Sequence, residues 1–188
     1  MKRTVFFLIT MMLIAACSTT KNVSSSDTAT SSRAESRKLK KLAEQAEVKK
    51  AVESRKYVIK VNRLYTTGGG FVEMIPRSNF LIINGEITSI SLGYMGRSFG
   101  TRPITGINLN AHTSSYHMEN NETKGGYNIE MSVKYGSDKF DVYVTVANDG
   151  SSNITINNAY IQSVRYSGEL EPLSNATRIG TDEPKQRM

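Results

Sequence analysis

Cys17 is the only cysteine in the 188-residue chain, so one thiol alone could react, pair with another chain or carry an attached group. Lys2 and Arg3 precede an apolar run over residues 5–14, and two alanines separate that run from Cys17. A basic segment, an apolar run and small residues before a cleavage point form the pattern of a secretory signal peptide. A membrane-spanning helix would need about 20 apolar residues. The sequence therefore predicts a signal peptide over residues 1–16.

The four residues that end at the cysteine, Ile14-Ala15-Ala16-Cys17, resemble the lipobox of bacterial lipoproteins. The resemblance implies lipidation of Cys17, with a thioether-linked diacylglycerol and an amide-linked third chain. Each buried methylene contributes about 0.8 kcal/mol, and although one chain binds only marginally, two or three chains hold a protein at a membrane. Ser18 stands where an acidic residue can act as an inner-membrane retention signal, so we expect the outer membrane, on its periplasmic face. The alternative is a small cysteine buried within a helix.

The two histidines, His112 and His117, are the candidates for acid–base or metal chemistry. Five residues apart on a strand, they point to opposite faces, so a shared metal would need a bulge or turn between them. His117 and Glu119 share a face, but two ligands without a third make a poor zinc site. The sequence has no Gly-x-Ser-x-Gly motif, no carboxylate pair spaced for a glycosidase, and no lysine after the glycines of residues 66–70. We therefore expect no catalytic residue, no metal and no cofactor.

Arginine and aromatic residues alternate with glycines in GYMGRSFGTRP, residues 93–103. Tyr94 and Phe99 flank Arg97, and Arg102 follows. An arginine between aromatic rings can hold an anionic ligand by paired hydrogen bonds and ring stacking. We therefore predict that these four residues bind a ligand at the mouth of a barrel. The alternative is that Arg97 closes one end of the barrel through backbone carbonyls.

Residues 17–36, which follow the predicted cleavage point, are dominated by Ser, Thr and Ala without an apolar period. This composition predicts a disordered, flexible tether behind the lipidated cysteine. Within it, Asp27-Thr28-Ala29 matches a short sequon that some Gram-negative envelope proteins use for O-glycosylation. Thr28 is therefore a candidate O-glycosylation site.

Residues 37–56 are rich in good helix formers and predict a basic amphipathic helix. Its narrow apolar face consists of Leu39, Leu42, Ala43 and Ala46. Residues 18–56 hold ten basic and five acidic residues, whereas the chain from residue 57 onward holds twelve of each. Secretion argues against the nucleic acid that a pI near 9.5 would suggest. We expect the basic arm to lie near anionic headgroups or the cell-wall polymer, or to have no partner.

The hydrophobic period changes from about four to two over residues 57–173. Residues 127–135 and 140–146 alternate apolar with polar side chains on either side of Gly136-Ser137-Asp138, which predicts an antiparallel hairpin. Asn84-Gly85 predicts a second hairpin with a type I′ turn. Roughly eight to ten short strands with one buried face indicate an all-β antiparallel barrel or half-open sandwich, preceded by one N-terminal α-helix. A C-terminal tail, residues 174–188, follows.

Three segments resemble the family called domain of unknown function 4251: SNFLIINGEITSISLGYMGRS, KGGYNIEMSV and YVTVANDGSSNITINNAYIQSVRYSGELEP. The family's Leu-Pro-Tyr-Phe-Gly-Arg segment corresponds to residues 92–97, with Gly93 and Met95 in place of proline and phenylalanine. Its tyrosine-glycine segment corresponds to residues 166–170. The resemblance covers about residues 54–173 and implies a lipocalin-like antiparallel β fold in lipoproteins of Gram-negative gut and oral bacteria. It implies no activity.

These patterns predict a non-enzymatic cell-envelope lipoprotein whose β domain binds a small hydrophobic or anionic ligand. The expected partners are the membrane, through acyl chains on Cys17, and a small molecule or an envelope protein. One alternative is a periplasmic scaffold in which the outer face of the β domain and the basic helix dock a partner. The other is a periplasmic hydrolase, which would need His112 or His117 in a cleft beside a carboxylate.

Overall fold

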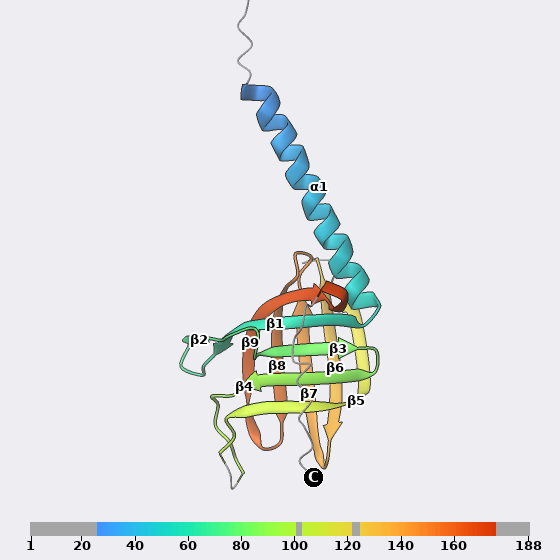
Figure 1. Cartoon of the computed structure of the whole chain (residues 1–188). Coiled ribbons are helices and arrows are strands. Elements are labelled where there is room, and N and C mark those ends of the chain that lie inside the picture. Colours follow the sequence, from blue (N-terminus) through green and yellow to red (C-terminus); the bar gives the residue numbers. More distant parts are fainter. Residues whose placement is uncertain (1–25, 101–102, 122–124, 176–188) are drawn as a thin grey trace, which may run out of the picture. The chain divides into compact units, whose positions relative to one another are not determined.

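The computed structural model describes residues 26–100, 103–121 and 125–175, and the chain divides into two compact units, residues 1–36 and 37–188. Figure 1 shows the elements in chain order. They are α1 (Ser26–Glu53), β1 (Lys56–Tyr65), β2 (Phe71–Glu73), β3 (Phe80–Asn84), β4 (Ile87–Gly93), β5 (Gly106–Asn120), β6 (Tyr127–Tyr135), β7 (Asp138–Val146), β8 (Ser151–Asn158), β9 (Ile161–Pro172) and the 3-10 turn η1 (Leu173–Asn175).

Eight of these strands close into an antiparallel barrel (Figure 1). Each strand from β3 to β8 pairs with the next one, and β1 closes the barrel by pairing with β3 on one edge and β9 on the other. The ninth strand, β2, pairs with the last three residues of β1, beyond the stretch that pairs with β3. The predicted all-β antiparallel domain behind one helix is confirmed, and it is a closed barrel rather than a half-open sandwich.

Apolar side chains fill the interior of the barrel. The predicted alternation in β6 and β7 is confirmed, because Ile129 and Val144 are buried while Glu130 and Tyr143 face outward. The largest fully buried side chains are Tyr57, Tyr166, Ile59, Leu64 and Leu81. Every buried side-chain nitrogen or oxygen of the described residues has a hydrogen-bond partner. A core of this size holds the fold without a disulfide.

The last turns of α1 cover one end of the barrel. Val48, Ala51 and Val52 are buried and belong to the same core cluster as the inward-facing strand residues. The apolar face predicted around Leu39 and Leu42 is instead exposed to solvent. The helix docks through its C-terminal residues because only these reach the barrel end, where Val48 lies close to Gly150.

The bounds of α1 differ from the predicted ones at both ends. The helix begins at Ser26, so the predicted disordered tether is wrong for residues 26–36, while residues 17–25 lie outside the described part. Alanine, glutamate and arginine in this stretch favour a helix enough to continue it. At the other end the helix stops at Glu53, because Arg55 takes a left-handed φ of 53° and leads into β1. No helix in the described part is long and apolar enough to span a membrane.

Turn geometry sets the two predicted hairpins. Tyr135 pairs with Asp138, so the hairpin between β6 and β7 is confirmed. Between β3 and β4, Asn84 pairs with Ile87, which makes Gly85 and Glu86 the turn residues. Gly85 has a φ of +63° and no positive φ occurs at Asn84 or Glu86. The predicted type I′ turn on Asn84-Gly85 is therefore wrong, and glycine takes the first turn position, as in a type II′ turn.

Candidate functional site

Four chain connections meet at the barrel end opposite Val52, and we call their described residues the open rim: residues 66–79, 94–100 with 103–105, 135–138 and 158–161. Hydrogen bonds join them. The Phe99 amide donates to the Tyr160 carbonyl at 2.8 Å, and the Gln162 side chain donates to the Thr67 hydroxyl at 3.1 Å. Segment 97–99 thereby lies along the start of β9, where Ser98 bridges to Ile161.

The open rim surrounds a cavity of about 590 Å³. Its apolar lining comes from strand ends and from segment 94–105, and consists of Phe99, Ile104, Ile107, Leu109, Phe140 and Ile161. Its polar lining consists of Asn108, Tyr135, Asp138, Asn158 and Tyr160. Among the described residues of this lining, Asp138 is the only carboxylate, and none is Lys, Arg or His. Apolar walls with a few polar groups and a volume in this range are typical of sites for small molecules.

The predicted ligand residues take different places around this cavity. Phe99 lines it and is exposed at the rim. Tyr94 is buried, and its hydroxyl lies 2.7 Å from the Arg97 carbonyl and 3.1 Å from the Gln162 carbonyl and shares its single proton between them. Neither Tyr94 nor Arg97 lines the cavity, and Arg102 lies outside the described residues.

Arg97 engages the barrel through its backbone. Its carbonyl accepts hydrogen bonds from the backbone amide of Gln162 at 2.8 Å and from the Tyr94 hydroxyl. Its backbone amide donates to the side-chain oxygen of Gln162 at 3.3 Å. Gly96 packs so closely on the Tyr94 ring that a Cβ there would lie 2.4 Å from the phenol oxygen. The segment thus holds Phe99 at the cavity, and the guanidinium of Arg97 is exposed.

Two tyrosines are enclosed at opposite ends of β1 and β9. The Tyr166 hydroxyl donates to the Gly93 carbonyl at 3.1 Å, and burial, with Tyr94 nearby, raises its pKa well above the usual value. Tyr57 shares a 3.3 Å hydrogen bond with Tyr116, and burial again raises the pKa of Tyr57, with Tyr116 adding to the shift. Arg55 lies 4.1 Å above the Tyr116 ring.

Raising the pH above about 10 is expected to lower the free energy of unfolding. The phenols of Tyr57 and Tyr166 ionise at lower pH in the unfolded chain than in the barrel, because their folded pKa values are raised. Their contribution is fully present below the unfolded pKa and is lost as the pH rises toward the folded one. Urea unfolding between about pH 8 and pH 11 measures this. Tyr166→Phe should show a shallower fall, and an equal fall in both proteins would contradict the assignment.

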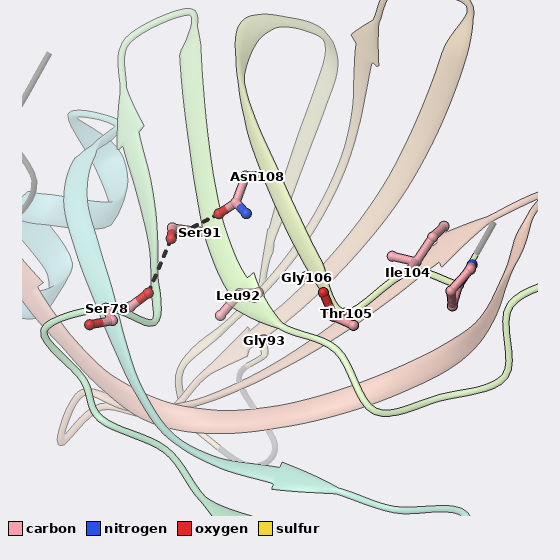
Figure 2. Close-up of a pocket in the computed structure, with 9 residues that line it drawn as sticks. Ser78, Ser91, Leu92, Gly93, Ile104, Thr105, Gly106 and Asn108 are labelled. Atoms are coloured by element: carbon pink, nitrogen blue, oxygen red, sulfur yellow. Dashed lines mark hydrogen bonds between the residues drawn. The ribbon is translucent and has the colours of Figure 1, made fainter. Parts of the chain in front are cut away.

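A second hollow lies on the outer wall, at the ends of β4 and β5 (Figure 2). Its volume is about 630 Å³, and its lining is mostly polar or glycine. The Ser91 hydroxyl lies 3.1 Å from the Ser78 carbonyl and 3.0 Å from the Asn108 side-chain oxygen, and donates its single proton between them (Figure 2). None of its described lining residues is ionisable, and its apolar surface is small, so its geometry supports binding less well than that of the rim cavity.

A family model for the domain of unknown function DUF4251 matches residues 39–170, well over half of the chain. The chain belongs to the DUF4251 family. A crystal structure of a DUF4251 protein from Bacteroides eggerthii is similar, with a TM-score of 0.60, 18% identity, and coverage of 70% of this chain and 89% of that one. At this identity the likeness shows the fold alone. No curated protein matches the chain.

Both histidines of this DUF4251 chain lie on the outside of the barrel. A register shift between Thr113 and Ser115 inserts one residue into β5, so His112 and His117 both face outward and the expected opposite faces are wrong. The His117 ring lies 3.0 Å from Glu119. Within the described residues no three His, Cys, Asp or Glu side chains could hold a metal ion. Neither histidine lines the rim cavity.

The two predicted modification sites of the DUF4251 chain fall at or beyond the limits of the described part. Cys17 lies outside it. The backbone of Thr28 lies inside α1, although a tether was expected there, and its side chain is not among those described.

Proposed function

We propose that this DUF4251 protein binds a small apolar molecule in the rim cavity, as a non-enzymatic lipoprotein of the periplasmic face of the outer membrane. The observation that carries the binding proposal is the cavity of about 590 Å³ walled by Phe99, Ile104, Ile107, Leu109, Phe140 and Ile161. Because the barrel interior below is filled, the ligand would sit at the mouth and not deep in a hollow barrel.

The lining favours a particular ligand chemistry. Burying apolar ligand surface contributes about 25 cal/mol per Å². The hydroxyls of Tyr135 and Tyr160 and the amide of Asn158 can bond a polar end group. Asp138 would repel an anion there, and the guanidinium of Arg97 does not line the cavity. The geometry therefore favours an apolar molecule with a neutral or cationic polar end over the anionic ligand that the sequence also predicted.

Gly100→Trp is expected to lower the affinity for the neutral apolar dye Nile red by about tenfold or more, which corresponds to 1.4 kcal/mol. Gly100 lines the cavity, and a Cβ added there meets no atom within 4 Å, so the indole can enter the open space without moving the backbone. Dye fluorescence titration measures the affinity.

Gly68→Trp is the matched control, because a Cβ at Gly68 also meets nothing within 4 Å but this residue does not line the cavity. Unchanged dye affinity in Gly100→Trp, or an equal loss in Gly68→Trp, would show that the dye binds elsewhere. Both variants should unfold within about 0.5 kcal/mol of the wild type.

The membrane anchor is a separate part of the proposal, supported by Ile14-Ala15-Ala16-Cys17 behind a short apolar run. Cells fed an alkyne fatty acid should label the wild-type protein and leave Cys17→Ser unlabelled. Two or three acyl chains hold a protein at a membrane where one does not, so wild type should stay with membranes after a salt wash. Wild-type protein that carries no label would refute the anchor and leave the cavity proposal standing.

A further inference from the structure

Exposed apolar side chains gather on the open rim. Eleven large hydrophobic side chains are exposed in the described part, and seven of them belong to the four connections of the open rim. They are Phe71, Val72, Ile75, Met95, Phe99, Tyr135 and Tyr160. Such a cluster marks an interaction surface, because exposed hydrophobic residues on a surface without a partner are usually scattered singly.

Arginines alternate with these side chains. Arg77 and Arg97 belong to the open rim, and Arg63 and Arg165 lie on the strand ends next to it, on β1 and β9. All four are exposed, and none of them forms an ion pair with a described residue. The Arg63 guanidinium lies 5.0 Å above the Phe71 ring, and that of Arg165 lies 4.4 Å above the Tyr65 ring. The described acidic residues of the rim and its adjoining strand ends are Glu73, Asp138 and Asp141, and Asp141 is paired with Lys139. The surface is therefore apolar, aromatic and net positive.

We infer that the open rim docks onto an anionic lipid bilayer. Tyrosine, phenylalanine and arginine are side chains that sit at the boundary of headgroups and acyl chains, with rings in the apolar layer and charges in the polar one. The four arginines complement anionic headgroups, and each contributes about a fivefold gain in partitioning. Phe99, Tyr135 and Tyr160 belong to both the rim and the cavity lining, so docking would place the cavity mouth against lipid. The docking goes beyond ligand binding and does not require it.

The chain contains no tryptophan, so single tryptophans can report where it meets a membrane. We would use residues 17–188 with Cys17→Ser, which carries no acyl chain, and compare Met95→Trp on the rim with Tyr143→Trp on the outer wall of β7. Both positions are exposed in solution. With vesicles of phosphatidylcholine and phosphatidylglycerol, the emission of Met95→Trp should shift to shorter wavelength, and that of Tyr143→Trp should stay unchanged. Arg77→Gln should lower the partition coefficient, measured by sedimentation with the vesicles, about fivefold.

The paired reporters separate the rim from the basic helix, which can also bring the chain to anionic vesicles. Sedimentation with vesicles while Met95→Trp keeps its emission in water would overturn the inference, because the helix alone would then make the contact. Equal shifts in both reporters, or binding to phosphatidylcholine alone with no gain from phosphatidylglycerol, would overturn it as well. No binding to either vesicle would also refute it, and would leave a protein as the partner of the rim. Dye binding in the cavity can persist in each of these cases, so the two proposals fail separately.

Discussion

Replacement of Gly168 by alanine is expected to lower the free energy of unfolding by about 3 kcal/mol or more, at the upper end of the overpacking range. Gly168 lies on β9 opposite Val61, where a register shift lets one extra residue of β1 bulge toward it. A Cβ at Gly168 would stand 2.2 Å from the Lys60 carbonyl oxygen and 2.9 Å from the Val61 Cα, and both are backbone atoms that side-chain rotation cannot move. The substitution would therefore separate the strand pair that closes the barrel.

Urea unfolding followed by circular dichroism measures this change, with Gly68→Ala as the control. Gly68 lies in the turn after β1, where a Cβ meets no atom within 4 Å, so its replacement should change the free energy of unfolding by less than about 0.5 kcal/mol. Equal stability of Gly168→Ala and Gly68→Ala would contradict the close approach of β1 and β9 that defines the closed barrel.

Replacement of Val52 by aspartate is expected to lower the free energy of unfolding by about 3 kcal/mol or more at neutral pH. Val52 is fully buried among Val48, Ala51 and the inward-facing strand residues at the covered end of the barrel. A carboxylate there would be desolvated without a hydrogen-bond or ion-pair partner. Burial would raise its pKa above that of the unfolded chain, so the deficit should shrink as the pH falls from neutral toward about 4, the pKa of the unfolded chain, and level off below it.

Leu42→Asp on the same helix is the matched control for this prediction. Leu42 is 52% exposed, so the new carboxylate stays in water and the free energy of unfolding should change by less than about 0.5 kcal/mol. Thermal unfolding of the two variants side by side decides the matter. A Val52→Asp protein as stable as Leu42→Asp would mean that the last turns of α1 do not cover the barrel.

The fold could be predicted from the sequence because the inner face of the barrel sheet is buried and its outer face is exposed to solvent. This makes apolar and polar residues alternate in β6 and β7, and it places glycine and asparagine between strands. Two local features could not be predicted in this way. The helix extends back to Ser26 through a stretch whose composition also fits a tether. The turn between β3 and β4 lies one residue later than predicted, because Asn84 pairs with Ile87 and leaves Gly85 and Glu86 as the central turn residues.

The candidate site could be predicted only in part. The arginines and aromatics of residues 93–103 predict a ligand segment, and its described part does reach the barrel mouth, but through Phe99 and backbone bonds and not through the Arg97 side chain. Ile107, Leu109 and Phe140 were missed, because an inward-facing residue at a strand end has the same pattern as one in the core. The available signal was position: these residues stand within four positions of connections at the same barrel end. The bulge that puts both histidines outside also has a signal, because the apolar residues of β5 stand at 107, 109 and 111 before it and at 116 and 118 after it.

The central proposal is that a small apolar ligand binds in the cavity lined by Phe99, Phe140 and Ile161. The most direct measurement is a crystal structure of the protein purified from the membranes of the cells that make it, without denaturant or lipid extraction. We predict continuous electron density against those three side chains, with its polar end near Tyr135 or Asn158. Ordered water alone in that cavity, or density confined to the outer hollow at Ser91 and Asn108, would contradict the account.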